Sequence, residues 1–254
     1  EKLNNLSKKK LIDLKVDHKI CFGSINSIHY SKYLNNGGSI NIGSIKNNYF
    51  SKRVHKDKNL IIYVSQWHDS SFKTLNHNVP GDIFFKPTDS LIINFLADYC
   101  SKNKKKFKVL LRNSTATNIN RENEEDYFTD ICSRPIDFIT TNTNFNSYDA
   151  CDSAEVIIGS ESTLLYESLA RGNKTAIFSI RDDMLSRTSY NKLFKKKSFT
   201  FGWPGNFKDF GFFWTNRAST KDFYKIITYL VNVEMDKWEI KLNNFAIDKL
   251  MVFD

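Results

Sequence analysis

The strongest constraint on the fold is a repeated alternation of short apolar stretches, rich in β-branched residues, with stretches of helical periodicity. Strands are predicted at residues 19–23, 59–65, 107–112, 137–141, 155–159 and 174–179. Helices are predicted between them at residues 89–101, 122–132 and 162–171. Such alternation favours an α/β fold, with a Rossmann-like, doubly wound parallel sheet that carries helices on both faces.

The remaining segments indicate how the chain divides. Residues 44–58 are polar and basic and precede a strand that opens a new β–α series, which is typical of an interdomain linker. Residues 201–214 are rich in aromatic side chains and predict an ordered loop that packs under the sheet. After about residue 220 the pattern becomes helical, at 221–231 and 237–251, and we expect these helices to pack back across a domain junction.

Size and composition indicate a folded protein. The chain has 254 residues, 41% of them hydrophobic and 14% aromatic, which is enough for a large core in one or two domains. The longest apolar run, at 60–64, is far shorter than the roughly 20 residues of a membrane span, and no secretion signal opens the chain. We therefore predict a cytoplasmic protein. The 4 cysteines show no Cys-x-x-Cys spacing, and we expect reduced, buried thiols.

The net charge of +9 is unevenly distributed. Residues 1–110 hold 19 Lys and Arg against 8 Asp and Glu, a net +11, so the remainder carries −2. This asymmetry fits an anionic partner, such as a nucleotide or an anionic membrane surface, and it also fits an ordinary solvated face. The lysine runs lack interleaved aromatic residues and any zinc or helix-turn-helix pattern, so we expect no nucleic-acid partner.

The most informative segment, residues 152–179, has the pattern strand, Gly-Ser turn, helix, strand. In open parallel sheets, ligands bind beyond the carboxyl ends of the strands, where a helix N-terminus offers free N–H groups to a phosphate. We expect Gly159, Ser160, Ser162 and Thr163 at that position, where small residues let a phosphate approach and hydroxyls add hydrogen bonds. The alternative is that Ser160 or Ser162 is only the N-cap of the helix.

A carboxylate follows on the predicted helix. At about 100° per residue, Glu167 points away from the sheet and lies one turn from the expected phosphate, where it can accept hydrogen bonds from two ribose hydroxyls. Its alternative role is an exposed ion pair with Arg171 at i,i+4. The side chains expected to face the sheet are Leu164, Leu165, Ser168 and Leu169.

Two other strand ends point to the same edge of the sheet. Ser65 and Gln66 stand where the predicted strand at 59–65 ends, and Arg112 ends the strand at 107–112. An arginine at this position can bind a phosphate with two hydrogen bonds, although a lone arginine is also a common surface ion-pair partner. His68 follows nearby without metal-ligand spacing, as expected for a polar loop residue.

Absent motifs narrow the class of nucleotide site. The sequence contains neither Gly-x-Gly-x-x-Gly nor Gly-Lys-Ser/Thr, which disfavours dinucleotide dehydrogenases and P-loop NTPases. The class of nucleotide site that remains is a Rossmann-like domain in which a helix N-terminus binds the phosphate.

The segment DSAEVIIGSESTLLYESLARGNKTAIFS, residues 152–179, is similar to the donor-site segment of GT-B glycosyltransferases of bacterial surface polysaccharide biosynthesis. That segment typically has an Asp-Ala-hydrophobic run, a Gly-Ser/Thr turn, a helical glutamate, then glycine and a hydrophobic strand. Upstream, KICFGS and INIGSIKNNYF resemble the last strands of the first domain in such enzymes. The resemblance spans about residues 17–178.

The resemblance implies a GT-B C-terminal domain together with a remnant of the N-terminal domain. Residues 1–58 then form the end of the acceptor domain and the linker, 59–220 the nucleotide-sugar-binding domain, and 221–254 helices that pack toward the junction. We expect most of the acceptor-binding half to lie outside this sequence. We therefore assign no catalytic base, and expect these residues alone to bind nucleotide without efficient transfer.

The implied reaction is transfer of a sugar from a nucleotide-activated donor to a growing surface polysaccharide or lipopolysaccharide. The partners are then a nucleotide sugar and a glycan or glycolipid acceptor, with peripheral contact at the inner face of the cytoplasmic membrane. By this resemblance Ser160, Ser162 and Thr163 hold phosphate, and Glu167 contacts ribose. No Asp-x-Asp triplet is present, which implies a metal-independent enzyme without a further cofactor.

The donor nucleotide stays open. The paired Ser/Thr turn is also similar to that of transferases that use CMP-linked Kdo or sialic acid, and to glycerophosphate transferases. Such enzymes often carry a His-Pro pair on an earlier strand, where this chain has Arg112 and Asn113. CMP, UDP and GDP therefore remain alternatives. A nucleotide-sugar 2-epimerase of the same fold and a non-catalytic nucleotide-binding module are the competing functions.

Overall fold

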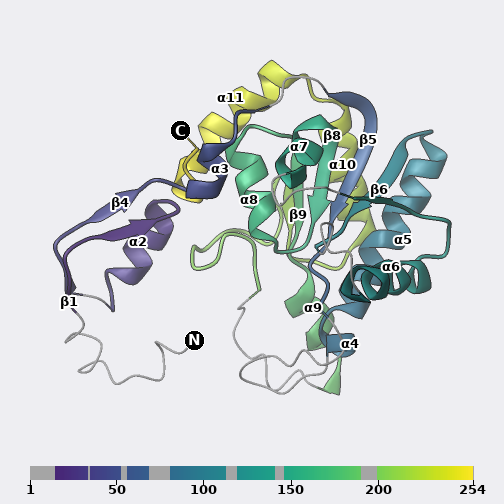
Figure 1. The fold of residues 1–254 in the computed structure, drawn as a ribbon, viewed down its shortest axis with the longest axis horizontal. Coiled ribbons are helices and arrows are strands. Elements are labelled where there is room, and N and C mark those ends of the chain that lie inside the picture. The colour runs from purple at the N-terminus through teal and green to yellow at the C-terminus, as the bar shows by residue number, and fades with distance from the viewer. Residues whose placement is uncertain are drawn as a thin grey trace.

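The computed structural model describes residues 15–33, 35–52, 56–68, 81–112, 119–140, 146–189 and 199–253. Within these residues the centre is a six-stranded parallel sheet in the order β10-β9-β8-β5-β6-β7 (Figure 1). Its strands are β5 (Asp57–Val64), β6 (Lys106–Leu110), β7 (Asp137–Ile139), β8 (Ala154–Gly159), β9 (Thr175–Phe178) and β10 (Trp214–Thr215). The five strands predicted from residue 59 onward thus share one parallel sheet, which confirms the Rossmann-like α/β fold, whereas the strand predicted at 19–23 lies in a separate two-stranded sheet.

Helices cover both faces of this sheet. They are α4 (Gly81–Phe84), α5 (Lys86–Lys102), α6 (Ile119–Ile131), α7 (Asn146–Ser153), α8 (Thr163–Ala170), α9 (Arg181–Ser186), α10 (Thr220–Asn232) and α11 (Met235–Phe245). Helix α5 packs against α10 on one face, with the Phe95 and Phe223 rings 5.5 Å apart. Helices α7 and α8 contact each other on the other face. The connections that lead to β8 and β9 run in the opposite direction to those that lead to β6 and β7, so right-handed crossovers place their helices on opposite faces of the sheet. No helix within the described ranges is long and apolar enough to cross a membrane.

The sheet is buried on both faces. Ile61, Ile62 and Tyr63, three consecutive residues of β5, are fully inaccessible to solvent. Because successive strand residues point to opposite faces, this burial requires helices on each side, as is usual for parallel sheets. The core of the domain therefore follows from the continuous apolar runs in the sequence.

The aromatic segment 201–214 forms an ordered structure next to the sheet. Phe201 and Phe213 are fully buried, and the Phe201 ring stacks on Trp214 with centroids 4.6 Å apart. The segment ends in β10, a two-residue edge strand paired with β9. This strand is too short to produce a period in the sequence, and it is absent from the predicted strands.

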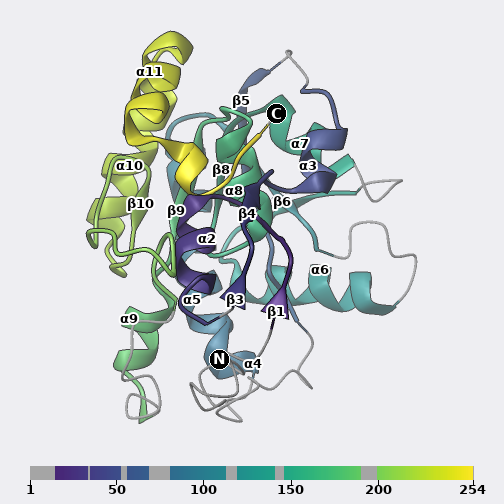
Figure 2. The same cartoon turned by 90° about the vertical axis from the view of Figure 1, so that its left-hand side faces the viewer.

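A small N-terminal unit, residues 15–49, lies beside the main sheet (Figures 1 and 2). It contains β1 (Lys15–Val16) paired with β3 (Asn35–Asn36), β2 (Lys19–Cys21) paired with β4 (Ser39–Asn41), and the helices α2 (Ser24–Tyr30) and α3 (Ile45–Tyr49). The predicted linker at 44–58 is therefore partly regular, since it contains α3 and the start of β5. Ser44 caps α3 by accepting a hydrogen bond from the Asn47 N–H over 3.3 Å.

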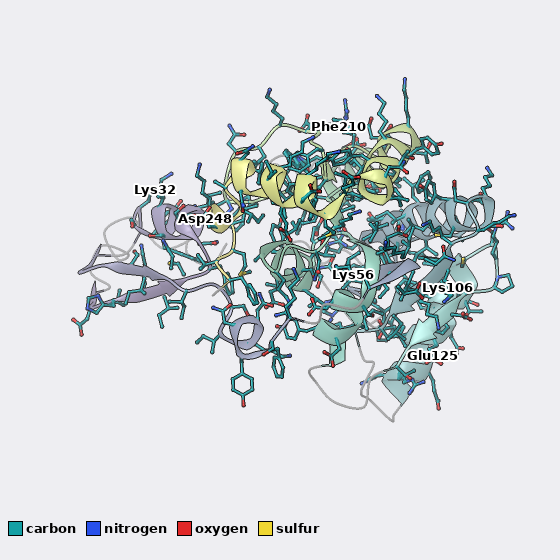
Figure 3. The ribbon with its side chains drawn as sticks, turned by 90° about the horizontal axis from the view of Figure 1, so that it is seen from above. Lys32, Lys56, Lys106, Glu125, Phe210 and Asp248 are labelled. Atoms are coloured by element: carbon teal, nitrogen blue, oxygen red, sulfur yellow. The ribbon has the colours of Figure 1, made fainter. Side chains whose placement is uncertain are left out.

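The C-terminal residues pack onto this N-terminal unit. Helix α11 ends at Phe245, and a 3₁₀ turn at Ile247–Lys249 contacts both α2 and α8. The Val252 N–H donates to the Phe22 carbonyl over 2.9 Å, and a Cβ at Gly43 would lie 1.8 Å from the Val252 carbonyl oxygen. Gly43, with φ +68°, is thus required by this close approach. Figure 3 shows Lys32 and Asp248 at this junction. The division into domains at residues 58 and 220 stays a prediction.

The cysteines are free thiols. Cys21, Cys100 and Cys151 are buried, whereas Cys132 is half-buried, so the prediction of burial was wrong for Cys132 alone. Burial raises the pKa of both Cys100 and Cys151 to about 12. These two thiols therefore stay protonated near neutral pH.

A fully buried ion pair ties the connecting segments to the domain. Arg171, directly after α8, donates from Nε and Nη2 to the two carboxylate oxygens of Asp152, over 3.1 and 2.5 Å. Its Nη1 and Nη2 also donate to the carbonyls of Phe50 and Ser51, at 2.8 and 3.2 Å. The guanidinium lies 4.9 Å from the Phe253 ring. One side chain thus joins α8, the end of α7, the α3–β5 connection and the C-terminal tail.

We predict that Arg171→Met lowers the free energy of unfolding by about 3–5 kcal/mol, because it leaves the buried Asp152 carboxylate without its cation. Urea denaturation followed by circular dichroism measures the change.

The matched control is Arg134→Met. Arg134 pairs with Asp98 over 2.6 Å, but both side chains are about half exposed, at 46% and 50%. Exposed pairs contribute at most about 1 kcal/mol, so this variant should unfold almost like the wild type. An equally small effect of both substitutions would contradict the role given to Arg171.

Candidate functional site

The order in which the chain adds strands to the sheet reverses between β5 and β8. The chain continues from β5 to β6 and β7 on one side, and then to β8, β9 and β10 on the other. Ligands of open α/β sheets bind at such a switch point, beyond the carboxyl ends of the strands. Val64 pairs with both Leu110 and Gly159, which brings the ends of β5, β6 and β8 to one level. The candidate site is this edge, on the side of α4 and α9 (Figure 2).

The β8–α8 turn contributes four of the predicted residues. A Cβ on Gly159 would lie 2.9 Å from Leu165 Cδ1 and 3.1 Å from the Val64 carbonyl oxygen, so glycine permits the close packing of β8. The Ser160 hydroxyl is buried and has no hydrogen-bond partner among the described residues. Ser162 occupies the N-cap position of α8, but its side chain makes no capping hydrogen bond. Thr163 is exposed on the first turn. A capping role for the Ser162 hydroxyl is therefore not supported.

The end of β5 is held by hydrogen bonds across the switch point. Ser65 is buried, and its hydroxyl donates to Glu124 Oε1 over 2.5 Å. Gln66 Oε1 accepts from the Glu161 N–H at 3.1 Å, which joins the β5 end to the β8–α8 turn. Ser65 therefore bonds to α6, whereas Gln66 holds the β8–α8 turn.

Arg112 lies at the end of β6 on the same edge. Its backbone N–H donates to Glu124 Oε1 over 2.8 Å, and its Nη1 donates to the Trp67 carbonyl over 3.1 Å. The same nitrogen lies 2.5 Å from Nδ1 of His68. The guanidinium is exposed and carries no ion pair among the described residues that would fix it. The structure therefore brings Arg112 to the edge, next to the end of β5.

Glu167 occupies a different setting from the one we expected. It is only 8% exposed, and it lies where α8 meets α7 and α3. Burial, the charge of Glu167 and a hydrogen bond with that carboxylate raise the pKa of Tyr148. This face of α8 is therefore covered by α3 and α7, and the predicted contact of Glu167 with ribose stays a prediction. The alternative pairing with Arg171 is wrong, because Arg171 binds Asp152.

Two charged residues at this edge are not among the predicted site residues. Arg181 begins α9 directly after β9 and is 2% exposed, and its Nη1 donates to Glu161 Oε2 in the β8–α8 turn. Glu161 lies between Ser160 and Ser162, in the turn that the sequence pattern indicates. An arginine that follows an apolar strand is the signal that selects Arg112, and the same rule would select Arg181.

The Glu161 carboxyl has an unusual proton affinity. Burial raises its pKa to about 7, with Asp182 and Asp89 acting in the same direction and Arg181 opposing them. Asp89 itself is fully buried on α5, where the Tyr63 hydroxyl donates to it over 2.7 Å. Burial also raises the pKa of Asp89, against the effect of that hydrogen bond. The edge thus contains a carboxyl group that titrates near neutral pH.

Comparison with known proteins identifies a family. Residues 3–254 match the family described as "putative O-antigen biosynthesis protein". No curated protein matches the chain. A solved structure, "Structure of the Wall Teichoic Acid Polymerase TagF", is similar with a TM-score of 0.42 and 14% identity, over 94% of this chain and 55% of that chain. The chain therefore spans about half the length of that solved chain.

We predict a pH-dependent stability from Glu161. Because its folded pKa of about 7 exceeds the ordinary value of 4.5, the folded state binds a proton that the unfolded state releases. Its contribution to stability is present below about pH 4.5 and is lost as the pH rises to about 7, by up to about 3 kcal/mol.

The measurement is urea denaturation of wild type and Glu161→Gln between pH 5 and 8. The difference in unfolding free energy, wild type minus variant, should fall as the pH rises. Glu122→Gln, at an exposed position on α6, should run parallel to the wild type. A difference for Glu161→Gln that does not change with pH would contradict the prediction.

Proposed function

This chain belongs to the family of O-antigen biosynthesis proteins, and we propose that it is a glycosyltransferase that takes a sugar from a nucleotide-activated donor. The acceptor in this proposal is a growing surface polysaccharide or lipopolysaccharide. The fold supports the proposal, because a Rossmann-like sheet offers one nucleotide site at its switch point.

The observation that carries the proposal is the β8–α8 turn beside that switch point, where the Ser162 side chain does not cap α8. Gly159 brings the backbone close to β5, and the first turn of α8 lacks a cap from the Ser162 side chain. Helix N-terminal N–H groups attract anions, and the leaving group of nucleotide-sugar transfer is a phosphate. We therefore propose that the turn binds the donor phosphates through its N–H groups, Ser160, Ser162 and Thr163, and stabilises the leaving group.

The remaining predicted residues take supporting roles in this proposal. Gln66 holds the turn through the Glu161 N–H, and Ser65 orients the β5 end through Glu124. The exposed Arg112 supplies positive charge at the same edge. We retain Glu167 as the ribose contact, shared with Tyr148. The nucleotide, the sugar, the independence from metal and a peripheral contact with an anionic cytoplasmic membrane stay parts of the proposal that await experiment.

We predict that Ser162→Ala weakens nucleotide binding about tenfold without lowering stability, since a hydrogen bond to a charged ligand is lost but no cap is removed. A thermal-shift screen with CMP, CDP, UDP and GDP selects the ligand, which should stabilise the fold by roughly 2.7 kcal/mol at 100 times its dissociation constant. Calorimetric titration then gives the affinities of both proteins.

Ser219→Ala is the matched control. Ser219 is the N-cap of α10, and its hydroxyl does accept a hydrogen bond from the Asp222 N–H, at 3.3 Å. Its loss should cost about 1 kcal/mol of stability and leave affinity unchanged. The donor-site assignment would fail if Ser162→Ala behaved like this control.

We predict a second contrast at the ribose contact. If Glu167 binds ribose, Glu167→Gln weakens nucleotide affinity about tenfold, whereas Tyr148→Phe, which removes only the hydroxyl partner of that carboxylate, leaves affinity near the wild-type value. The same calorimetry checks both variants. Lower melting temperatures in both, with unchanged affinities, would assign Glu167 to the packing of α7 on α8.

A further inference from the structure

Arg181 and Arg171 are buried to the same extent but differ in their hydrogen bonds. Each is 2% exposed. All three nitrogens of Arg171 donate to acceptors, which are carbonyl oxygens, the Asn47 amide and the Asp152 carboxylate. Of Arg181, only Nη1 has a partner, while Nε and Nη2 find no acceptor among the described residues. A buried guanidinium with free donors is unusual in a folded protein, and such groups often mark functional sites.

Further unpaired groups lie next to Arg181. Its partner Glu161 has a second oxygen, Oε1, that accepts no hydrogen bond within the described part of the chain, and the neighbouring Ser160 hydroxyl is likewise unpaired. The Ser179 hydroxyl donates to the Ser160 carbonyl over 3.4 Å, so the β9–α9 connection directly adjoins the β8–α8 turn. Guanidinium N–H groups, a hydroxyl and the first turn of α8 without a side-chain cap thus lie close together around the β8–α8 turn.

The chemistry of this position suits an anion with several oxygen acceptors. A guanidinium can donate two parallel hydrogen bonds to a phosphate, and burial strengthens such bonds. The rings of Phe84 and Phe85 each lie 4.7 Å from Arg181 Cζ, which holds the guanidinium at the edge and excludes water from its faces.

We propose that Arg181 binds a phosphate group of the donor, and that Glu161 holds the guanidinium in place until this phosphate replaces it. The proposal rests on the proposed function, and it assigns a binding role to a residue outside the predicted turn. The phosphate then accepts hydrogen bonds from Nε, Nη2 and the Ser160 hydroxyl, which have no partner within the described ranges.

Glu161 makes this binding depend on pH. The groups that act on its carboxyl are Arg181 and Asp182 on α9 and Asp89 on α5. A phosphate that reaches Arg181 comes close to the Glu161 carboxylate, and two like charges in a buried site favour protonation of the carboxyl. Binding should therefore take up a proton, and affinity for the anion should decrease as the pH rises through about 7.

The experiment measures calorimetric affinity for inorganic pyrophosphate at pH 8 and constant ionic strength. Arg181→Gln should weaken binding about tenfold, because the charge-assisted hydrogen bonds are lost. Glu161→Gln should strengthen binding several-fold, because it removes the competing carboxylate. The control, Arg134→Gln, removes one positive charge at the surface and should bind like the wild type.

Opposite effects of the two substitutions separate a binding pair from a structural one. A purely structural ion pair predicts lower melting temperatures and unchanged affinity in both variants, and that result would overturn the proposal. If Arg181→Gln does not fold, the comparison of Glu161→Gln with wild type decides alone: tighter binding supports the proposal, and equal or weaker binding overturns it.

The same measurements distinguish failure of the proposed function. Pyrophosphate binding that follows this pattern, without binding of any screened nucleotide, would support the anion site and count against a nucleotide donor. Nucleotide and pyrophosphate binding that Arg181→Gln and Glu161→Gln leave unchanged would support the donor site and overturn the role of Arg181.

Discussion

The buried pair of Arg171 and Asp152 is the interaction on which the arrangement of the segments depends. Asp152 lies in the last turn of α7 and Arg171 follows α8, so the pair fixes the two helices that flank β8. The remaining donors of Arg171 bind carbonyls between α3 and β5, which lie more than 100 residues away in the chain. A charge in the interior is stable only if its counter-charge and hydrogen bonds are complete. Completing them requires the N-terminal connection to run against α8.

The complete hydrogen bonding of Arg171 can be compared with that of the buried polar groups at the carboxyl edge of the sheet. There the equally buried Arg181 has one acceptor, and Ser160 has none in the described ranges. The polar groups at the C-terminal end of α8, around Arg171, are hydrogen-bonded. Those at its N-terminal end, in Arg181 and Ser160, lack partners among the described residues. Proteins retain such groups where a ligand completes the hydrogen bonds, which is why the geometry favours the N-terminal end of α8 as the site of binding.

The sequence allowed the sheet to be predicted because its strands are continuous apolar runs. Ile61 to Val64 are buried on both sides, and this pattern has no other common explanation in a β–α series. The same reasoning located the β8–α8 turn and the strand ends at Ser65 and Arg112. It missed β10, whose two residues belong to an aromatic cluster, and it missed Arg181, whose burial depends on Phe84 and Phe85, almost 100 residues upstream.

Glu167 shows why periodicity alone cannot define a binding face. The angle around α8 separates the side chains that face the sheet from those that do not, and in this respect it placed Leu165 and Leu169 correctly. It carries no information on what else covers the helix. Here α7 brings Tyr148 to Glu167, and α3 brings Asn47. A ligand at Glu167 must therefore share a carboxylate that the protein already uses, whereas a ligand at Arg181 meets donors that have no acceptor among the described residues.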